Sequence, residues 1–148
     1  EGTVVMFICN HCPFVKHVFT GIVDLANDYM DKGVSFVAIS SNDVENYPDD
    51  APDLMTKVAA EQKFPFAYLY DETQEVARAY DAACTPDFYI FDMNKALVYR
   101  GQLDDSRPEN GIPVTGNDMR SALEAMCIGK EISVTQKPSI GCNIKWKS

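Results

Sequence analysis

The sequence lacks a long hydrophobic run, an even number of cysteines and an excess of basic residues. Its longest apolar stretch, Val4 to Cys9, has 6 residues, whereas a membrane-spanning helix needs about 20. Lys and Arg number 13 against 22 Asp and Glu, a net charge of −9, which argues against a nucleic-acid partner because phosphates attract basic side chains. Five cysteines exclude a framework in which every thiol is paired within the chain. We therefore expect no membrane and no nucleic-acid partner, and the role of unpaired thiols becomes the main question.

The composition and the N-terminal residues bear on the class of protein and on its compartment. Of the 148 residues, 46% are apolar and 24% charged, which is typical of a globular domain. The sequence begins Glu1-Gly2, without Met or an apolar leader, so we expect no signal peptide within it. Together with the odd number of thiols, this favours the reducing cytoplasm, or the periplasm if a leader has been removed.

Short apolar runs alternate with amphipathic segments along most of the chain. Hydrophobic periodicity predicts strands at 3–8, 34–40, 66–70, 87–92 and 96–100. Helices are expected from Pro13 to Gly33, after Pro52, over 73–80, and from a capping box at Thr115–Asp118 to Gly129. The three-residue polar connection between the last two strands has hairpin length, so these strands should be antiparallel.

This order of elements predicts one α/β domain. We expect a central, mostly parallel sheet with helices on both faces and an antiparallel C-terminal hairpin. The domain spans residues 1–129, whose net charge is −12, and an irregular tail at 130–148 carries +3. Charges of opposite sign favour packing of the tail on the same domain.

A Cys-x-x-Cys motif, Cys9-Asn10-His11-Cys12, lies between the first predicted strand and the first predicted helix. At this junction the helix N-terminus should favour an anion and lower the pKa of Cys9. Cys12, three residues further on, is near enough to close a small disulfide ring. Attack by Cys9 and resolution by Cys12 are the two halves of thiol–disulfide exchange. Protonated His11 adds positive charge beside the thiolate.

Two other interpretations of the motif stay open at this stage. The thiols are inert core residues, or they belong to a metal site for zinc or copper formed by Cys9 and Cys12 with His11 or Cys142. Zinc sites usually need a second ligand pair at short spacing, and the sequence holds no second motif of this kind. We therefore expect no metal and no cofactor.

Thr85-Pro86 and three further cysteines also bear on the chemistry. Taken alone, a Thr-Pro pair before a strand is an ordinary trans turn, since only about 5–6% of such bonds are cis in folded proteins. Cys84 comes two residues before Pro86, and Cys142 lies in a glycine-containing tail that could return to the site; each is either a disulfide relay or a free structural thiol. Cys127 falls on the apolar face of the last helix and should fill the core.

Polar residues elsewhere are expected at the surface. His17 follows Pro13 by one helical turn and should face solvent. Arg100 and Arg107 flank Asp104-Asp105, which predicts an ion-paired surface loop.

The combination of these features resembles the thioredoxin superfamily. More closely, it resembles the bacterial redoxin-type proteins related to the alkyl hydroperoxide reductase and thiol-specific antioxidant group, in the segments FICNHCPFVKH (7–17), ACTPDFYIFD (83–92), YRGQLDDSRP (99–108) and PSIGCNIKW (138–146). The resemblance implies a thioredoxin-like fold, with Cys9 as the attacking thiol, Cys12 as the resolving thiol and Pro86 as a cis-proline opposite them. It also implies that the Thr85 backbone pairs with an extended substrate segment.

The function implied is that of a thiol–disulfide oxidoreductase acting on protein or small-molecule disulfides and thiols. The alternatives are a metal-binding or metal-delivery module using Cys9 and Cys12, and a thiol peroxidase with Cys9 as the peroxidatic residue. Against the peroxidase, Met6 stands where peroxiredoxins carry a Thr or Ser hydroxyl, three residues before the peroxidatic cysteine.

The chain departs from thioredoxin itself at two points and from the redoxin-type subgroup at a third. Ile8 stands where thioredoxin has a Trp, and Thr3 where it has a buried acid, so no side chain is evident that would transfer a proton at Cys12. An extra strand segment that usually comes before the first core strand is missing, which suggests N-terminal truncation. Because of His11, we predict a couple more oxidising than thioredoxin's roughly −270 mV.

Overall fold

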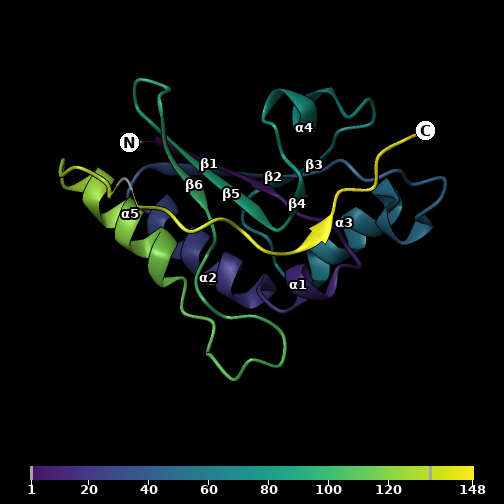
Figure 1. The fold of residues 1–148 in the computed structure, drawn as a ribbon, viewed down its shortest axis with the longest axis horizontal. Coiled ribbons are helices and arrows are strands. Elements are labelled where there is room, and N and C mark those ends of the chain that lie inside the picture. Colours follow the sequence, from purple (N-terminus) through teal and green to yellow (C-terminus); the bar gives the residue numbers. More distant parts are fainter. Residues whose placement is uncertain (1, 134) are drawn as a thin grey trace.

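The computed structural model describes residues 2–133 and 135–148, and its central element is a five-stranded sheet (Figure 1). The strand order is β3-β2-β1-β5-β6. Strands β1, β2 and β3 run parallel, and β5 is antiparallel to both β1 and β6. The strands are β1 (Gly2–Phe7), β2 (Val34–Ser40), β3 (Ala67–Tyr70), β5 (Asp87–Asp92) and β6 (Leu97–Gly101). The predicted α/β fold with a C-terminal antiparallel hairpin is therefore confirmed.

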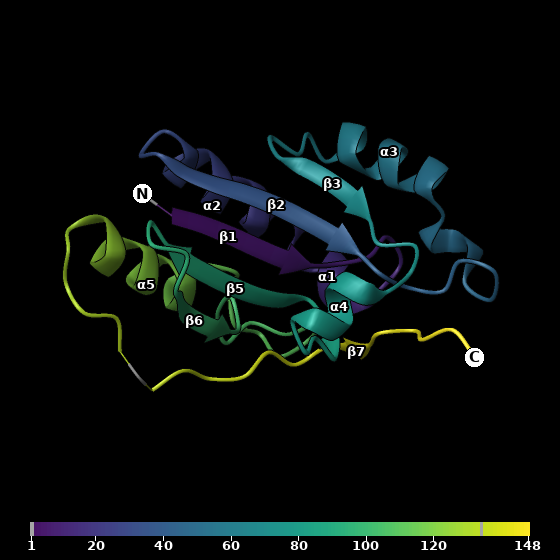
Figure 2. The same cartoon turned by 90° about the horizontal axis from the view of Figure 1, so that it is seen from above.

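Helices cover both faces of the sheet. In Figure 1, α1, α2, α3 and α5 lie below the sheet and α4 lies above it, and Figure 2 shows α4 on the side of β5 away from α2. The helices are α1 (Pro13–Lys16), α2 (Phe19–Met30), α3 (Pro52–Glu61), α4 (Glu75–Ala79) and α5 (Asn117–Cys127), and a short 3-10 helix spans Pro48–Asp50. Among the described residues, no helix combines the length and apolar character needed to cross a membrane.

The alternation of side chains along β1 builds two cores. Val4, Met6 and Ile8 are buried with apolar residues of α2 and α5, whereas Val5 and Phe7 are buried on the opposite face. Because successive side chains of a strand point to opposite faces, a continuous apolar run fills both cores at once. β1 is thus fixed from both sides, and the loop that follows it starts from a rigid support.

Two helix predictions were wrong in detail. The helix expected from Pro13 to Gly33 is interrupted after Lys16, where the Val18 N–H donates to the carbonyl of Val15 at 3.0 Å, so the turn tightens. The capping box expected at Thr115 is absent from α5. Instead Gly116 precedes the helix with a φ of 74°, a conformation that glycine adopts without the steric cost of a side chain.

The C-terminal residues return along the molecule and add a second, two-stranded sheet. Strand β7 (Cys142–Asn143) pairs antiparallel with β4 (Cys84–Thr85). The Gln102 N–H donates to the carbonyl of Lys137 at 3.0 Å, and the Asp43 N–H donates to that of Lys145 at 2.8 Å. In both views the tail, drawn in yellow, runs from α5 past β6 towards α4 (Figures 1 and 2).

Candidate active site

The Cys9–Cys12 loop lies at the carboxyl end of β1. At this edge of the sheet it meets the loop after β2, which contains Asp50, and the turn formed by Thr85 and Pro86. The Thr85–Pro86 peptide bond is cis, as the resemblance implied. Both cysteines of the loop are buried, with 1% of Cys9 and 0% of Cys12 exposed. The topology therefore brings the predicted thiols, Thr85 and Pro86 together.

Thr85 contacts both thiols through different atoms. Its hydroxyl oxygen lies 3.6 Å from the Cys9 sulfur, and its carbonyl accepts a hydrogen bond from the Cys12 thiol at 3.6 Å. The two thiols lie in the same buried cluster, and their interaction shifts their pKa values in opposite directions. Neighbouring sulfurs held against one residue are a suitable starting point for forming a disulfide between them.

The acidity of the two thiols differs from the prediction. A hydrogen bond with Cys12, burial and the charge of Asp50 raise the pKa of Cys9. The pKa of Cys12 is lowered, first by the hydrogen bond from Cys9 and further by Cys142 and the backbone N–H of Val15. The main cause of both shifts is the interaction between the two thiols, and Cys12, not Cys9, is the N-cap of α1.

His11 has a carboxylate partner that sequence reasoning did not identify. Its Nδ1 lies 2.6 Å from Oδ2 of Asp50, whose side chain is 0% exposed whereas that of His11 is 30% exposed. The His11 ring also stacks on Tyr47, with 6.2 Å between the ring centroids. A positive charge on His11 is therefore compensated by Asp50, and its effect on Cys9 is smaller than the motif alone suggests.

Asp50 also holds the loop between the cysteines in place. Its Oδ1 accepts hydrogen bonds from the backbone N–H groups of Asn10 at 2.8 Å and His11 at 3.3 Å, and Asn42 donates to its Oδ2 at 2.9 Å. Tyr68 of β3 donates to the Asn10 side chain at 3.0 Å. In the sequence Asp50 is one of several acidic residues in a polar loop. The only signal was that loops after neighbouring parallel strands meet at one edge of a sheet.

The remaining cysteines occupy different surroundings. In the β4–β7 pair Cys142 is the partner of Thr85, and it contributes to the lowering of the pKa of Cys12. The Thr85 backbone, predicted to receive a substrate segment, is thus paired with the chain's own tail. Cys84 points its thiol towards two backbone carbonyls at 3.9 Å, and Cys127 packs partly buried against the core.

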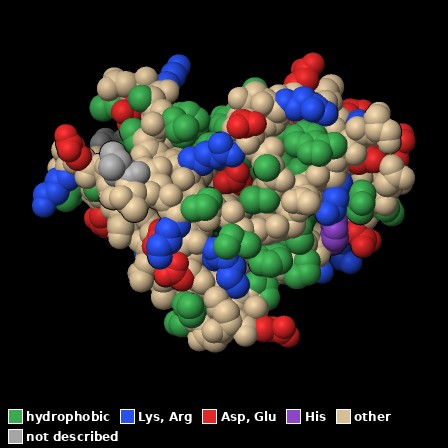
Figure 3. All heavy atoms as spheres, viewed as in Figure 1, with side chains coloured by type: hydrophobic (Ala, Val, Ile, Leu, Met, Phe, Trp, Pro, Cys, Tyr) green, Lys and Arg blue, Asp and Glu red, His purple; other side chains and the backbone are tan. Residues whose placement is uncertain are grey.

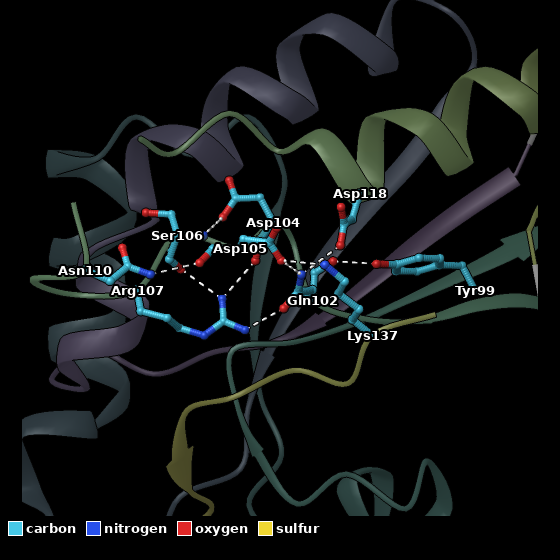
Figure 4. Close-up of polar contacts among 9 residues, drawn as sticks. All are labelled: Tyr99, Gln102, Asp104, Asp105, Ser106, Arg107, Asn110, Asp118 and Lys137. Atoms are coloured by element: carbon cyan, nitrogen blue, oxygen red, sulfur yellow. Dashed lines mark hydrogen bonds and ion pairs between the residues drawn. The ribbon is translucent and has the colours of Figure 1, made fainter. Parts of the chain in front are cut away.

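The loop after β6, which was predicted to be an ion-paired surface, is so only at the exposed Asp105, which lies 3.1 Å from Lys137; the residues around Asp104 form a buried polar network (Figure 4). Only 3% of Asp104 is exposed, and its carboxylate accepts backbone N–H groups of Ser106, Thr115 and Gly116 at 2.7–2.9 Å. The hydroxyl of Ser106 lies 2.7 Å from Nε2 of His17, so the prediction that His17 faces solvent was also wrong. Backbone donors in a tight turn need an acceptor, and Asp104 supplies it.

The two arginines of this region have separate roles. Arg107 donates to the carbonyls of Asp104 and Ser106 at 2.8 and 2.9 Å. Arg100 points to the other side of the strand, where it lies 3.5 Å from Asp87. The expected ion pairs with the acidic loop are therefore not formed by these two residues.

A metal ion would find a loose set of donors at this site. Atoms of Cys9, His11 and Asp50 lie within 4.8 Å of one another. Donors that bind one zinc ion at 2.0–2.3 Å are about 3.3–3.8 Å apart. Asp50 already accepts the backbone N–H of Asn10 and the side chain of Asn42, so it would have to give up part of these contacts.

Comparisons with known proteins agree with this architecture. The fold and the paired thiols define a thioredoxin-like protein. Residues 1–100 match the model of the AhpC/TSA family, and the chain belongs to that family, which confirms the resemblance seen in the sequence and supports a thiol redox function. No curated protein sequence matches the chain.

Solved structures extend the similarity to nearly the whole chain. An uncharacterized conserved protein from Geobacillus kaustophilus is 70% identical, with a TM-score of 0.97, and the match covers 99% of this chain and 77% of that one. A hypothetical protein from Sinorhizobium meliloti is 46% identical, with a TM-score of 0.98 and coverage of 99% and 80%. A secreted disulfide oxidoreductase from Mycobacterium tuberculosis, at 14% identity, a TM-score of 0.65 and coverage of 84% and 81%, shares the fold.

Proposed function

We propose that the protein is a thiol–disulfide oxidoreductase in which Cys9 attacks and Cys12 resolves. The observation that carries the proposal is the buried pair of thiols, both held against Thr85 at 3.6 Å. Cys9 lies on the side of His11, which is partly exposed, whereas Cys12 lies on the side of Cys142. Because only 1% of Cys9 is exposed, a partner reaches it after an opening motion on the His11 side.

The reaction follows from the position of the two thiols. As Cys9 attacks one sulfur of a partner disulfide, its proton passes to the Cys12 thiolate, the partner's sulfur–sulfur bond breaks and one partner thiolate leaves. Cys12 then passes its proton to solvent or to the leaving thiolate and attacks the sulfur of Cys9. The second partner thiolate leaves and the Cys9–Cys12 disulfide forms. The partner gains two electrons and the dithiol loses two.

Protein and small-molecule disulfides or thiols in the cytoplasm are the proposed partners. A small hollow beside Pro86 is lined by Phe14, Ile140 and Arg107, and it offers both apolar and polar contacts. On the face seen in Figure 3, Lys and Arg side chains are interspersed with Asp and Glu. This mixed surface suits a range of partners better than a single strongly charged one.

The test replaces Cys9 by Ser and measures the reduction of insulin disulfides or exchange with a small dithiol. We expect exchange to be abolished while circular dichroism shows an unchanged fold, since the hydroxyl is a far weaker nucleophile. Cys127→Ser is the control, because it removes a thiol that lies outside the site. Full activity of the Cys9 variant would contradict the proposal.

A metal-binding module is the second candidate, favoured by the cluster of Cys9, His11 and Asp50. An anaerobic titration with zinc or copper(I) tests it. Stoichiometric binding that Cys9→Ser and Asp50→Asn both abolish would favour this function over exchange. A peroxidase has less support, because Met6 is fully buried in the core and offers no hydroxyl to a peroxide; consumption of hydrogen peroxide with a thiol reductant would test it.

A further inference from the structure

Cys142 reaches the buried dithiol from the far end of the chain. In the β4–β7 pair, Cys142 lies opposite Thr85, the residue whose carbonyl accepts the Cys12 thiol at 3.6 Å. Cys142 also packs against the buried cluster that contains Cys9 and Cys12, and it contributes to the lowering of the pKa of Cys12. Cys12 therefore has a second cysteine beside it in addition to Cys9, with which its sulfur can pair.

The tail is built for this close approach. A β-carbon at position 141 would overlap the carbonyl oxygen of Thr85, so only a glycine lets the backbone pass here. On the other side of Cys142, the Ile144 N–H donates to the carbonyl of Ala83 at 3.0 Å, and the Ile144 side chain is 3% exposed within the second core. Cys142 is thus held between two anchored neighbours.

Accessibility separates Cys142 from the other two thiols. Cys9 and Cys12 are almost completely covered, whereas Cys142 is partly exposed. A disulfide confined to Cys9 and Cys12 needs an opening motion before a partner meets it. Exchange with Cys142 takes place inside the protein, because Cys142 lies opposite Thr85, the residue that contacts the Cys12 sulfur.

We propose that Cys142 is a third redox thiol, which exchanges with the Cys9–Cys12 disulfide and carries it towards the surface. The Cys142 thiolate attacks the sulfur of Cys12, the Cys9–Cys12 bond breaks, the Cys12–Cys142 bond forms, and Cys9 leaves as a thiolate that takes up the proton lost by Cys142. No electrons are gained or lost by the protein in this step. The inference rests on the proposed function, which supplies the first disulfide.

The acidity of Cys142 favours this step when Cys9 and Cys12 are oxidised to a disulfide. Burial, and then the hydrogen bond and charge of Cys12, raise the pKa of Cys142 to about 11. When Cys12 is part of a disulfide it carries no charge, so both of its contributions are removed and Cys142 ionises more easily. The third thiol is therefore a better nucleophile when the pair is oxidised.

The test uses the full-length Cys9→Ser protein, treated with oxidised glutathione, quenched with acid and mapped by mass spectrometry. We expect the glutathione adduct on Cys12 to be displaced by Cys142, giving a Cys12–Cys142 linked peptide. The lifetime of the glutathione adduct on Cys12 should be shorter by about 100-fold or more than in the double variant with Cys142→Ser, because a neighbouring thiol has a high effective concentration. The double variant with Cys127→Ser, which has the same number of thiols, should behave like the single variant.

Two outcomes would overturn the third-thiol proposal. One is an adduct that lives equally long with and without Cys142, and the other is a linked peptide that joins Cys12 to Cys84. If the Cys9 variant does not fold, peptide mapping of the oxidised wild-type protein tests the proposal instead. That protein should contain both the Cys9–Cys12 and the Cys12–Cys142 linked peptide. A Cys9–Cys12 link alone contradicts this inference, whereas the absence of both links contradicts the proposed function as well.

Discussion

The two flanks of Cys12 differ in how they are built. On one flank, Cys9 is three residues away and shares its surroundings with the paired side chains of His11 and Asp50. On the other flank, Cys142 comes from the C-terminal tail and is positioned by backbone pairing. The first flank suits attack on an external disulfide, and the second suits transfer within the protein. This contrast underlies our proposal that one thiol serves two neighbours with different tasks.

The largest effect should come from removing the thiol that both flanks share. We expect Cys12→Ser to lower the rate of disulfide exchange by roughly 100-fold, about 2.7 kcal/mol of transition-state stabilisation. It should also trap a mixed disulfide at Cys9, because neither Cys12 nor the more distant Cys142 can release it. Steady-state exchange assays with mass spectrometry of the trapped species check this. Normal turnover of the Cys12→Ser variant through Cys142 would contradict the different roles of Cys9 and Cys142.

The Cys9 flank was largely predictable from the sequence, and the Cys142 flank was not. The motif, the strand before it and the Thr85-Pro86 pair are encoded by neighbouring residues whose spacing carries the chemistry. Asp50 and the contact of Cys142 with Cys12 depend on strand order and on the register of β4 with β7, which no local pattern specifies. The helix N-terminus at Pro13 was predicted correctly, but its effect was assigned to Cys9, whereas Cys12 is the N-cap of α1.

The second effect concerns the anchoring of the Cys142 flank. Gly141→Ala should force the tail away from the Thr85 carbonyl and cost about 1–3 kcal/mol of unfolding free energy, as overpacking usually does. Urea unfolding measures the loss, and alkylation of Cys142 in the reduced protein should become faster. Asn143→Ala, an exposed change in the same strand, is the control. Equal stability of the two variants would mean that the tail is not held where the structure places it.

The third effect concerns the charge on the Cys9 flank. Asp50→Asn removes a negative charge that raises the pKa of Cys9, so the reduced form becomes more favourable and the couple more oxidising. We expect a rise in potential on the order of 30 mV, which corresponds to about 1.4 kcal/mol. Equilibration with glutathione buffers measures it, and the exposed neighbour Asp49→Asn serves as control. An unchanged or lower potential would show that Asp50 acts only as a support for the loop.

The fourth effect is the pH dependence of the reduced protein. The pKa of Cys12 is lowered in the folded state from 9.0 to about 4, so its thiolate contributes stability that is present above the unfolded value and is lost as the pH falls through the folded one. The melting temperature of the reduced protein should therefore decline from about pH 8 to about pH 5 relative to that of Cys12→Ser. Calorimetry checks this. A difference in melting temperature between the two proteins that does not change with pH would contradict the lowered pKa of Cys12.

The central claim is that Cys9 and Cys12 form a reversible disulfide, and a redox titration with peptide mapping tests it most directly. The reduced wild-type protein is equilibrated with glutathione buffers of increasing potential, quenched with acid and mapped. We predict a single two-electron transition in which two thiols are lost and Cys12 is found linked, chiefly to Cys9 and in part to Cys142. A protein that keeps all its thiols, or that accumulates a stable glutathione adduct on Cys9, would contradict the account.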